Sequence, residues 1–380
     1  MRDKRNEDPP SERHRCARVE MFSNHSKDRG SDMQITTYGV DLAKRVFQLH
    51  WVEAQTGEVK RKTLMRSEVS EFFAQREPGI VAMEACGSAH HWARMLKRLG
   101  HQVLLVSAQF VRPFVKTNKT DAADAQAIWE AAQRPQMRFV AVKSEAQQAV
   151  LSLHRMRQQL VKIRTMQALQ IRSLLYEFGV VLPKSWRALL LQAGPWLSDE
   201  TRTEIPQLLR GELLRQLDAL RALTERIKQL EQALASYRGR LEECQRIEAI
   251  PGIGRLSATA LIATIGDART FRSGREMAAF LGLVPRQSGT GGRVRLLGIS
   301  KRGDPYLRTL LIHGARSVIN HGSRPGRTLD PWISALLRRR PKNVAIVALA
   351  NKIARTAWAL LAHGRSFDRS WSQALPAPAL

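Results

Sequence analysis

The chain has 380 residues, which is enough for two or three domains with cores of their own. Lys and Arg number 61 against 34 Asp and Glu, so the formal net charge is +27. Such an excess favours nucleic acid as a partner. A membrane surface is a weaker alternative, because the basic residues are spread along the chain and not gathered on one amphipathic segment. The three cysteines, Cys16, Cys86 and Cys244, lie far apart, which excludes a disulfide framework and a cysteine zinc site and predicts a cytoplasmic protein.

Residues 1–32 carry many charges of both signs and few large apolar side chains, so we expect a disordered tail. Met33 directly precedes the first expected strand, and we interpret the tail as an extension upstream of the true start. Residues 366–380 are a second expected tail. We find no uninterrupted apolar run of about 18 residues and therefore predict no transmembrane helix and no membrane partner.

A mixed α/β domain is expected over residues 33–142. Three strands in series come first, followed by helices that alternate with two short apolar strands. The expected strands are 34–41, 46–52, 58–64, 80–84 and 102–106, and the expected helices are 67–76 and 90–99. This order is typical of a ribonuclease H-like sheet.

Four acidic residues are placed to act together in this domain. Asp41 and Glu84 end the first and fourth strands, while Asp121 and Asp124 lie one helical turn apart at the start of a helix that Thr120 can cap. Carboxylates that share a face repel each other unless a cation lies between them. We therefore predict a site for two metal ions that polarise a phosphodiester. The alternative is an acidic helix start on a solvated surface.

A helical middle segment is expected over residues 143–246. The first long helix, 143–178, has an apolar seam at Leu153, Met156, Leu160, Ile163 and Leu174. A connector rich in Pro, Trp and Gly follows at 183–197, and residues 213–244 then show nearly five heptads. Such a repeat predicts a coiled coil, between subunits or as a hairpin with the first helix. The alternative is a core helix of a bundle.

A helix-hairpin-helix is expected over residues 247–266, at the start of a mostly helical carboxy-terminal domain, 247–365. Gly252 and Gly254 allow a tight turn whose backbone N–H groups, with the helix that begins at Arg255, can bind a DNA phosphate. The alternative is a turn that only joins two helices.

Glycines, arginines and serines are concentrated in residues 286–304, after a buried apolar segment, 280–285. A serine hydroxyl near arginines and a metal could attack a phosphodiester. The alternative is a phosphate-binding loop with incidental serines. Helices are expected at 306–318 and 344–361, and the basic cluster 338–342 is a phosphate contact or a solvated turn. The expected nucleic-acid-binding residues are Lys119, Gly252, Gly254, Arg255, Arg286, Arg293, Arg295, Lys301 and Arg302.

These motifs resemble the DEDD-type insertion-sequence transposases over about residues 35–365. The acid set in its context Asn118–Ala125 resembles their Holliday-junction-resolvase-like (RuvC-like) amino-terminal domain. The carboxy-terminal resemblance runs from Ile250-Pro251-Gly252-Ile253-Gly254 through Gly282-Leu283-Val284-Pro285 and Gln287-Ser288-Gly289 to Lys301-Arg302-Gly303.

The resemblance implies a DNA recombinase that excises and inserts its own element. It implies that the four acids bind Mg²⁺, that Ser288 is the nucleophile with Ser300 as runner-up, and that a structured RNA guides a homo-oligomer, a dimer or a tetramer. Two alternatives stay open: a Holliday-junction resolvase-like nuclease that hydrolyses DNA with the same acids, and an architectural nucleic-acid-binding protein. A helix of about 32 residues spans ~48 Å and separates the acids from Ser288, so we expect sites shared between subunits unless the first helix folds back beside it.

Overall fold

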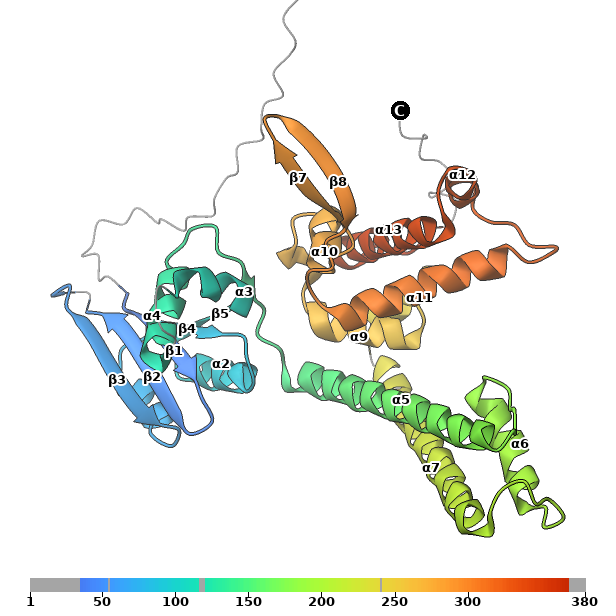
Figure 1. The fold of residues 1–380 in the computed structure, drawn as a ribbon. Coiled ribbons are helices and arrows are strands. Elements are labelled where there is room, and N and C mark those ends of the chain that lie inside the picture. The colour runs from blue at the N-terminus through green and yellow to red at the C-terminus, as the bar shows by residue number, and fades with distance from the viewer. Residues whose placement is uncertain (1–34, 54, 116–119, 240, 369–380) are drawn as a thin grey trace, which may run out of the picture.

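The computed structural model describes residues 35–53, 55–115, 120–239 and 241–368, and its elements are labelled in Figure 1. The tail expected at 1–32 lies outside the described residues, as does most of the tail expected at 366–380. Three groups of elements follow one another along the chain: a sheet with helices, a helical arm, and a carboxy-terminal group of helices that carries a β-hairpin.

The first group contains one mixed sheet with the strand order β3-β2-β1-β4-β5-β6. Strands β1, β2 and β3 pair antiparallel, β1, β4 and β5 pair parallel, and β6 runs antiparallel to β5. A mixed sheet, with three strands in series followed by two that alternate with helices, is what the sequence predicted, and the short β6 was not predicted. The strands are Thr37–Leu42, Val46–Val52, Val59–Met65, Ile80–Glu84, Gln102–Val106 and Phe139–Val140.

Helices cover both faces of this sheet. Helices α1 and α2 pack on the face that presents Tyr38, Phe47 and Leu105, and this is the larger core of the group. Helix α4 packs on the opposite face against β1 and β2. The helices of this group are α1 (Val69–Ala74), α2 (Ala89–Arg98), α3 (Ala108–Val111), the 3₁₀ turn η1 (Arg112–Phe114) and α4 (Asp121–Ala132); α3 and η1 were not predicted.

The arm is an intramolecular helix hairpin. Helix α5 (Glu145–Glu177) folds back beside α7 (Gln207–Arg238), and α6 (Trp186–Ser198) lies at its far end (Figure 1). Between α5 and α7, Arg157 forms a salt bridge of 2.6 Å with Glu231, and the Gln167 amide donates to the Gln216 carbonyl. Of the two expected coiled-coil arrangements, the pairing seen within this chain is the hairpin.

The predicted packing of the arm is wrong in three details. The heptad run ends at Arg238, so Leu241 and Cys244 belong to the next group; Cys244 is fully buried there. On α5 the predicted seam residue Met156 is 53 % exposed, because the helix contacts α6, α7 and α9 with different faces and buries His154 instead of a straight apolar seam. The segment 183–197 is mostly helix α6, and Pro195 lies inside it.

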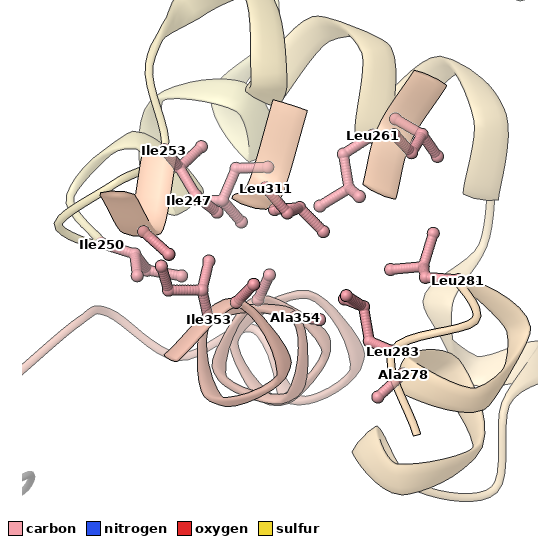
Figure 2. Close-up of a cluster of buried hydrophobic side chains, with 14 of the residues drawn as sticks. Ile247, Ile250, Ile253, Leu261, Ala278, Leu281, Leu283, Leu311, Ile353 and Ala354 are labelled. Atoms are coloured by element: carbon pink, nitrogen blue, oxygen red, sulfur yellow. The ribbon is translucent and has the colours of Figure 1, made fainter. Parts of the chain in front are cut away.

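The third group is built around α13, which packs between α10, α11, α12 and α8. Figure 2 shows isoleucines and leucines of this group meeting in one apolar core, to which Leu281 and Leu283 belong. The prediction that 280–285 is buried holds for its middle only, because Phe280 and Pro285 at its ends are exposed. The elements are α8 (Glu242–Glu248), α9 (Arg255–Ile265), η2 (Ala268–Thr270), α10 (Gly274–Phe280), β7 (Pro285–Thr290), β8 (Arg293–Ile299), α11 (Pro305–Gly322), α12 (Pro331–Arg339) and α13 (Lys342–His363).

By length and composition alone, α13 could cross a membrane, which the search for an apolar run did not anticipate. It carries Lys352 and Arg355 and buries Ile346, Ala350 and Ile353 in the core of this group. Its apolar character is therefore explained by protein packing on several sides.

A buried polar contact joins the arm to the third group. His154 on α5 hydrogen-bonds Tyr306 Oη at 2.9 Å and Thr259 Oγ1 at 3.0 Å. Burial, and secondarily Arg157, lower the pKa of His154 to about 4, so the imidazole stays neutral at physiological pH. A second contact joins the first group to the third, where Arg138 forms a salt bridge of 3.3 Å with Glu276.

Candidate active site

Three carboxylates from two elements meet at the edge of the sheet where β1 ends. Asp41 on β1 and Asp121 and Asp124 on α4 each bring one oxygen within 4.8 Å of the others. Asp41 and Asp124 are half-buried and Asp121 is exposed. Oxygen ligands at such spacing are what a hard divalent cation requires, so this donor set fits Mg²⁺ or a similar ion.

The start of α4 is fixed by its own sequence. Thr120 is the N-cap residue, as predicted, and its hydroxyl accepts a hydrogen bond from the Ala123 N–H at 3.2 Å. The two aspartates thus lie in the first turn, where the positive end of the helix dipole stabilises negative charge. Small side chains such as Ala125 and Ala127 are buried and let the helix lie close to the sheet.

Gly39 determines how close α4 comes to β1. A Cβ atom at Gly39 would overlap the Ala125 carbonyl oxygen and the Trp129 Cβ. The Trp129 indole also donates to the Thr37 carbonyl at 3.0 Å and holds the helix across the strand. Because Gly39 lies two residues before Asp41 on the same face of β1, this close approach brings the aspartates of α4 to Asp41. Sequence analysis did not single out Gly39 or Trp129; a glycine inside an apolar strand was the available signal.

The carboxylates perturb one another. Burial, then the charges of Asp124, Asp121 and Glu84, raise the pKa of Asp41 from 3.8 to about 6. A raised pKa means that the ionised group lacks compensating positive charge in the protein itself. A divalent cation supplies such charge.

Glu84, the fourth predicted acid, ends β4, which pairs parallel with β1 so that Val40 lies opposite Met83. Asp41 and Glu84 are therefore neighbours at one edge, and Glu84 raises the pKa of Asp41, although it lies outside the group of three within 4.8 Å. Cys86 follows, and burial together with Glu84 and Asp41 raises the pKa of its thiol, which keeps it protonated.

Ser288 lies on a β-hairpin and not in a loop. Strands β7 and β8 pair antiparallel around Gly291 and Gly292, whose φ angles are +55° and +80°. Two successive positive φ angles are what a tight two-residue hairpin turn needs. Residues 285–299 therefore form a β-hairpin with a Gly-Gly turn, which the sequence interpretation as a loop did not predict.

The register gives the hairpin two chemically different faces. Ser288 lies opposite Arg295 and Thr290 opposite Arg293, so these four side chains share one face. The other face presents Val294 and Leu296, which are 68 % and 63 % exposed. Arg286 is exposed beside the irregularity in β7. Among the described residues, no salt bridge engages Arg286, Arg293 or Arg295, so their charge is free for phosphate.

The base of the hairpin is held firmly. A Cβ at Gly303 would overlap the Phe280 carbonyl oxygen, and one at Gly282 would overlap Arg302 backbone, so these chain segments lie against each other. The Ser300 N–H donates to the Val284 carbonyl at 2.8 Å. The Ser300 hydroxyl is buried without a hydrogen-bond partner among the described residues, whereas Ser288 is exposed. Lys301 and Arg302 are exposed at this base.

Two short helices and a tight turn occupy the segment predicted as a helix-hairpin-helix. Gly252 has a φ of +97°, and its backbone packs against Gly314 of α11, so this glycine is explained by packing. Gly254 caps α9 with open space around it, and Arg255 is exposed in the first turn. The positions of Gly254 and Arg255 are therefore compatible with the predicted phosphate contact. Lys119, another predicted contact, lies outside the described residues.

The two chemical regions of one chain lie apart. Figure 1 shows the β7–β8 hairpin projecting from α10 and α13, while α4 and β1 occupy a different part of the molecule. The structure thus brings Asp41, Asp121 and Asp124 together but does not bring Ser288 to them.

Two family models match the chain. A model described as a transposase, of the DEDD type of IS110, matches residues 38–179, and a model described as "Transposase IS116/IS110/IS902 family" matches residues 244–330. The first spans the sheet and all of α5, and the second runs from within α8 to beyond the end of α11 and includes the hairpin.

Similar curated proteins carry the same description. The chain is 51% identical over 330 residues to a probable family 20 transposase of Pseudomonas aeruginosa, covering 87% of this chain and 97% of that protein. It is 41% identical to the transposase for insertion sequence element IS1328 of Yersinia enterocolitica, covering 88% and 99%. It is 39% identical to the transposase for insertion sequence element IS1111A of Coxiella burnetii, covering 95% and 99%.

Proposed function

Because the chain belongs to the IS110/IS116/IS902 family of DEDD insertion-sequence transposases, we propose that it moves its element by a phosphoserine exchange, with Ser288 as nucleophile and the acid set as a Mg²⁺ site. The observation that carries the proposal is the pairing of a clustered carboxylate group with an exposed serine flanked by free arginines. DNA is the substrate of such a transposase.

The acid set has a defined task in this scheme. Asp41, Asp121 and Asp124 would hold the cation, with Glu84 at its side, and a bound Mg²⁺ would supply positive charge at the phosphate oxygens. The pKa of Asp41, raised to about 6, matches a carboxylate that needs this charge. The four acids thereby orient the phosphodiester for in-line attack.

Ser288 acts as the nucleophile. Its Oγ forms a bond to phosphorus as the bond from phosphorus to one strand oxygen breaks, and the serine proton ends on that oxygen. The reverse exchange with a new strand hydroxyl restores the serine, so no external energy source is needed. Arg293 and Arg295 share the face of Ser288 and stabilise the charge that develops on the phosphate oxygens.

Each active site is shared between subunits in this proposal. Helix α5 folds back beside α7, but Ser288 and the acids of one chain still lie in different parts of the molecule (Figure 1). A homodimer or tetramer would let the acids of one chain face the serine of another.

A structured guide RNA is part of the proposal as a second nucleic-acid partner. Its support is the net charge of +27, which favours polyanionic partners. The competing function is a Mg²⁺-dependent resolvase that hydrolyses DNA. It is favoured by one observation, that Asp41, Asp121 and Asp124 assemble within one chain while Ser288 of that chain lies in another part of the molecule.

A covalent trap distinguishes the two functions. Labelled element-end DNA and wild-type protein should give a slow band on a denaturing gel, and Ser288→Ala should lose both the band and cleavage. Ser300→Ala is the matched control and should keep the band, because its hydroxyl is buried. Cleavage by Ser288→Ala protein would establish the hydrolytic mechanism. A band that is lost only in Ser300→Ala would identify Ser300, and not Ser288, as the nucleophile.

Mixed oligomers test the shared site. One chain carries Asp41→Ala and Asp124→Ala, and the other carries Ser288→Ala. With shared sites, a mixed oligomer keeps a complete site and cleaves one strand, whereas each variant alone is inactive. No cleavage in a preparation verified to contain mixed oligomers would reject sharing.

A further inference from the structure

A basic pocket lies at the end of the sheet that carries Asp41. It is open, has a volume of about 470 Å³, and is formed where three segments converge. The β1–β2 turn contributes Lys44 and Arg45, the end of β3 contributes Arg66 and Ser67, and the first turn of α2 contributes His91. Because β2 is antiparallel to both β1 and β3, the end of β1, this turn and the end of β3 all lie at one edge.

The side chains that line the pocket are positively charged, while the Glu68 carboxylate beside it accepts a hydrogen bond from the Met65 N–H at 2.7 Å. Lys44, Arg45 and Arg66 line it together, and no carboxylate does. Within the described residues, none of the three forms a salt bridge. Adjacent cations with no acidic partner repel one another in the free protein, and an anion in the pocket removes that repulsion.

Arg66 is held ready for such an anion. Its guanidinium lies 5.0 Å from the centroid of the Trp92 ring and 5.9 Å from that of Phe47, so two buried aromatic side chains fix its position. Its backbone N–H donates to the Arg45 carbonyl at 2.8 Å, which ties the end of β3 to the β1–β2 turn. The cations thus converge from two backbone segments that cannot drift apart.

The distance to the acids identifies the anion. Lys44 follows Asp41 by three residues, so their Cα atoms are at most about 11 Å apart. Phosphates of one DNA strand advance ~3.4 Å each along the helix axis. The acids lie on the α4 side of the sheet and the pocket lies on the α2 side, so the strand would pass over the end of β1 between them. A strand that crosses this end with its scissile phosphate at the acids would bring another phosphate to the pocket, about three nucleotides away.

We infer that the pocket of Lys44, Arg45 and Arg66 binds a non-scissile phosphate of the DNA strand held at the acid set. This inference rests on the proposed function and adds an anchor to it. The anchor fixes the position of the strand along the sheet edge, and with it the phosphodiester that the carboxylates meet.

A double variant tests the anchor. Lys44→Gln with Arg45→Gln removes two exposed charges from a turn and leaves the contact of Arg66 with the Trp92 ring intact. The matched control is Lys97→Gln with Arg98→Gln, which removes two exposed charges from the last turn of α2, at the other edge of the sheet. Affinity is measured over a salt series for element-end DNA, for the same DNA with single neutral methylphosphonates, and for an RNA of the same length. Circular dichroism checks folding.

We expect the Lys44/Arg45 variant to lower the salt slope for DNA by roughly 0.9 per lost phosphate contact, and to lose sensitivity to a methylphosphonate at one non-scissile position. The Lys97/Arg98 control should keep the wild-type slope and sensitivity profile. An unchanged Lys44/Arg45 variant, or an equal loss in the control, overturns the anchor. A loss confined to RNA also overturns it, since the phosphate is then not that of the DNA strand. A wild-type protein that binds no DNA contradicts the proposed function itself, and the anchor with it.

Discussion

The acid set and the serine hairpin are built in opposite ways. The acids lie on a central strand and on a helix packed against it, and Gly39 beneath them is filled by α4 backbone. Ser288 lies on a two-stranded hairpin whose side chains are exposed on both faces beyond its base. A lone hairpin gains little stability from its own contacts. The difference teaches that packing of the fold fixes the positions of the acids, whereas the hairpin side chains beyond the base pack on nothing else among the described residues.

The largest expected effect is loss of cleavage in Asp124→Asn. The substitution removes one negative charge from the cluster of three carboxylates. Because mutation of residues that only contact metal ligands already lowers metal affinity or activity roughly 10–100-fold, we expect a loss of cleavage activity of at least ~100-fold here. DNA affinity should change little, because binding rests on basic side chains. Strand cleavage and anisotropy binding measure the two, with exposed Asp218→Asn on α7 as control. Wild-type cleavage in Asp124→Asn protein would contradict the metal site.

Gly39→Ala should separate the two regions by stability. The added methyl group overlaps the α4 backbone, so we expect the unfolding free energy of the sheet domain to fall by about 1–3 kcal/mol. DNA cleavage should fall as well, because α4 carries two of the acids. Arg295→Ala on the exposed hairpin should stay within about 0.5 kcal/mol. Urea unfolding followed by tryptophan fluorescence compares them. Equal stabilities of the two variants would show that α4 shifts to make room for the methyl group, and that the acid set is no more tightly packed than the hairpin.

Asp41→Asn should show how much folding stability the protein loses through repulsion among its clustered carboxylates. The pKa of Asp41 is about 6 in the folded protein against 3.8 as the ordinary value, so metal-free wild-type protein loses stability as pH rises from about 4 to about 6. Asp41→Asn removes this loss. Without divalent ions it should be more stable than wild type at pH 7, by about 1–2 kcal/mol after solvent screening, and equal to it below pH 4. Thermal melts with chelator measure the difference, and Mg²⁺ should reverse its sign at pH 7.

The smallest effect concerns the salt dependence of binding. Arg293→Gln with Arg295→Gln should lower the slope of log affinity against log salt by roughly 0.9 for each phosphate released. Asp124→Asn should leave that slope unchanged, because the acids hold a cation and not the DNA charge. A slope that falls equally in both variants would show that the two regions do not divide binding and chemistry between them.

Local sequence alone determined most of the sheet and the start of the acid helix. Strands 46–52, 80–84 and 102–106 have the predicted bounds, and Thr120 caps α4 as expected, because apolar runs and capping residues act within a few neighbours. The first long helix was found with ends within two residues, whereas the second begins and ends six residues earlier than the predicted 213–244. The family followed from motifs that are contiguous in the chain.

Tertiary structure alone decided which residues meet. The heptads could not show that α5 folds back onto α7, or that its buried face includes His154, because the partners are distant in sequence. Likewise the sequence could not show that α4 packs against Gly39. It also could not show that Ser288 lies in a strand, where it pairs with Arg295 across the hairpin. Local propensities act over a few residues, whereas register, close packing and the separation of the two chemical regions depend on contacts between distant segments.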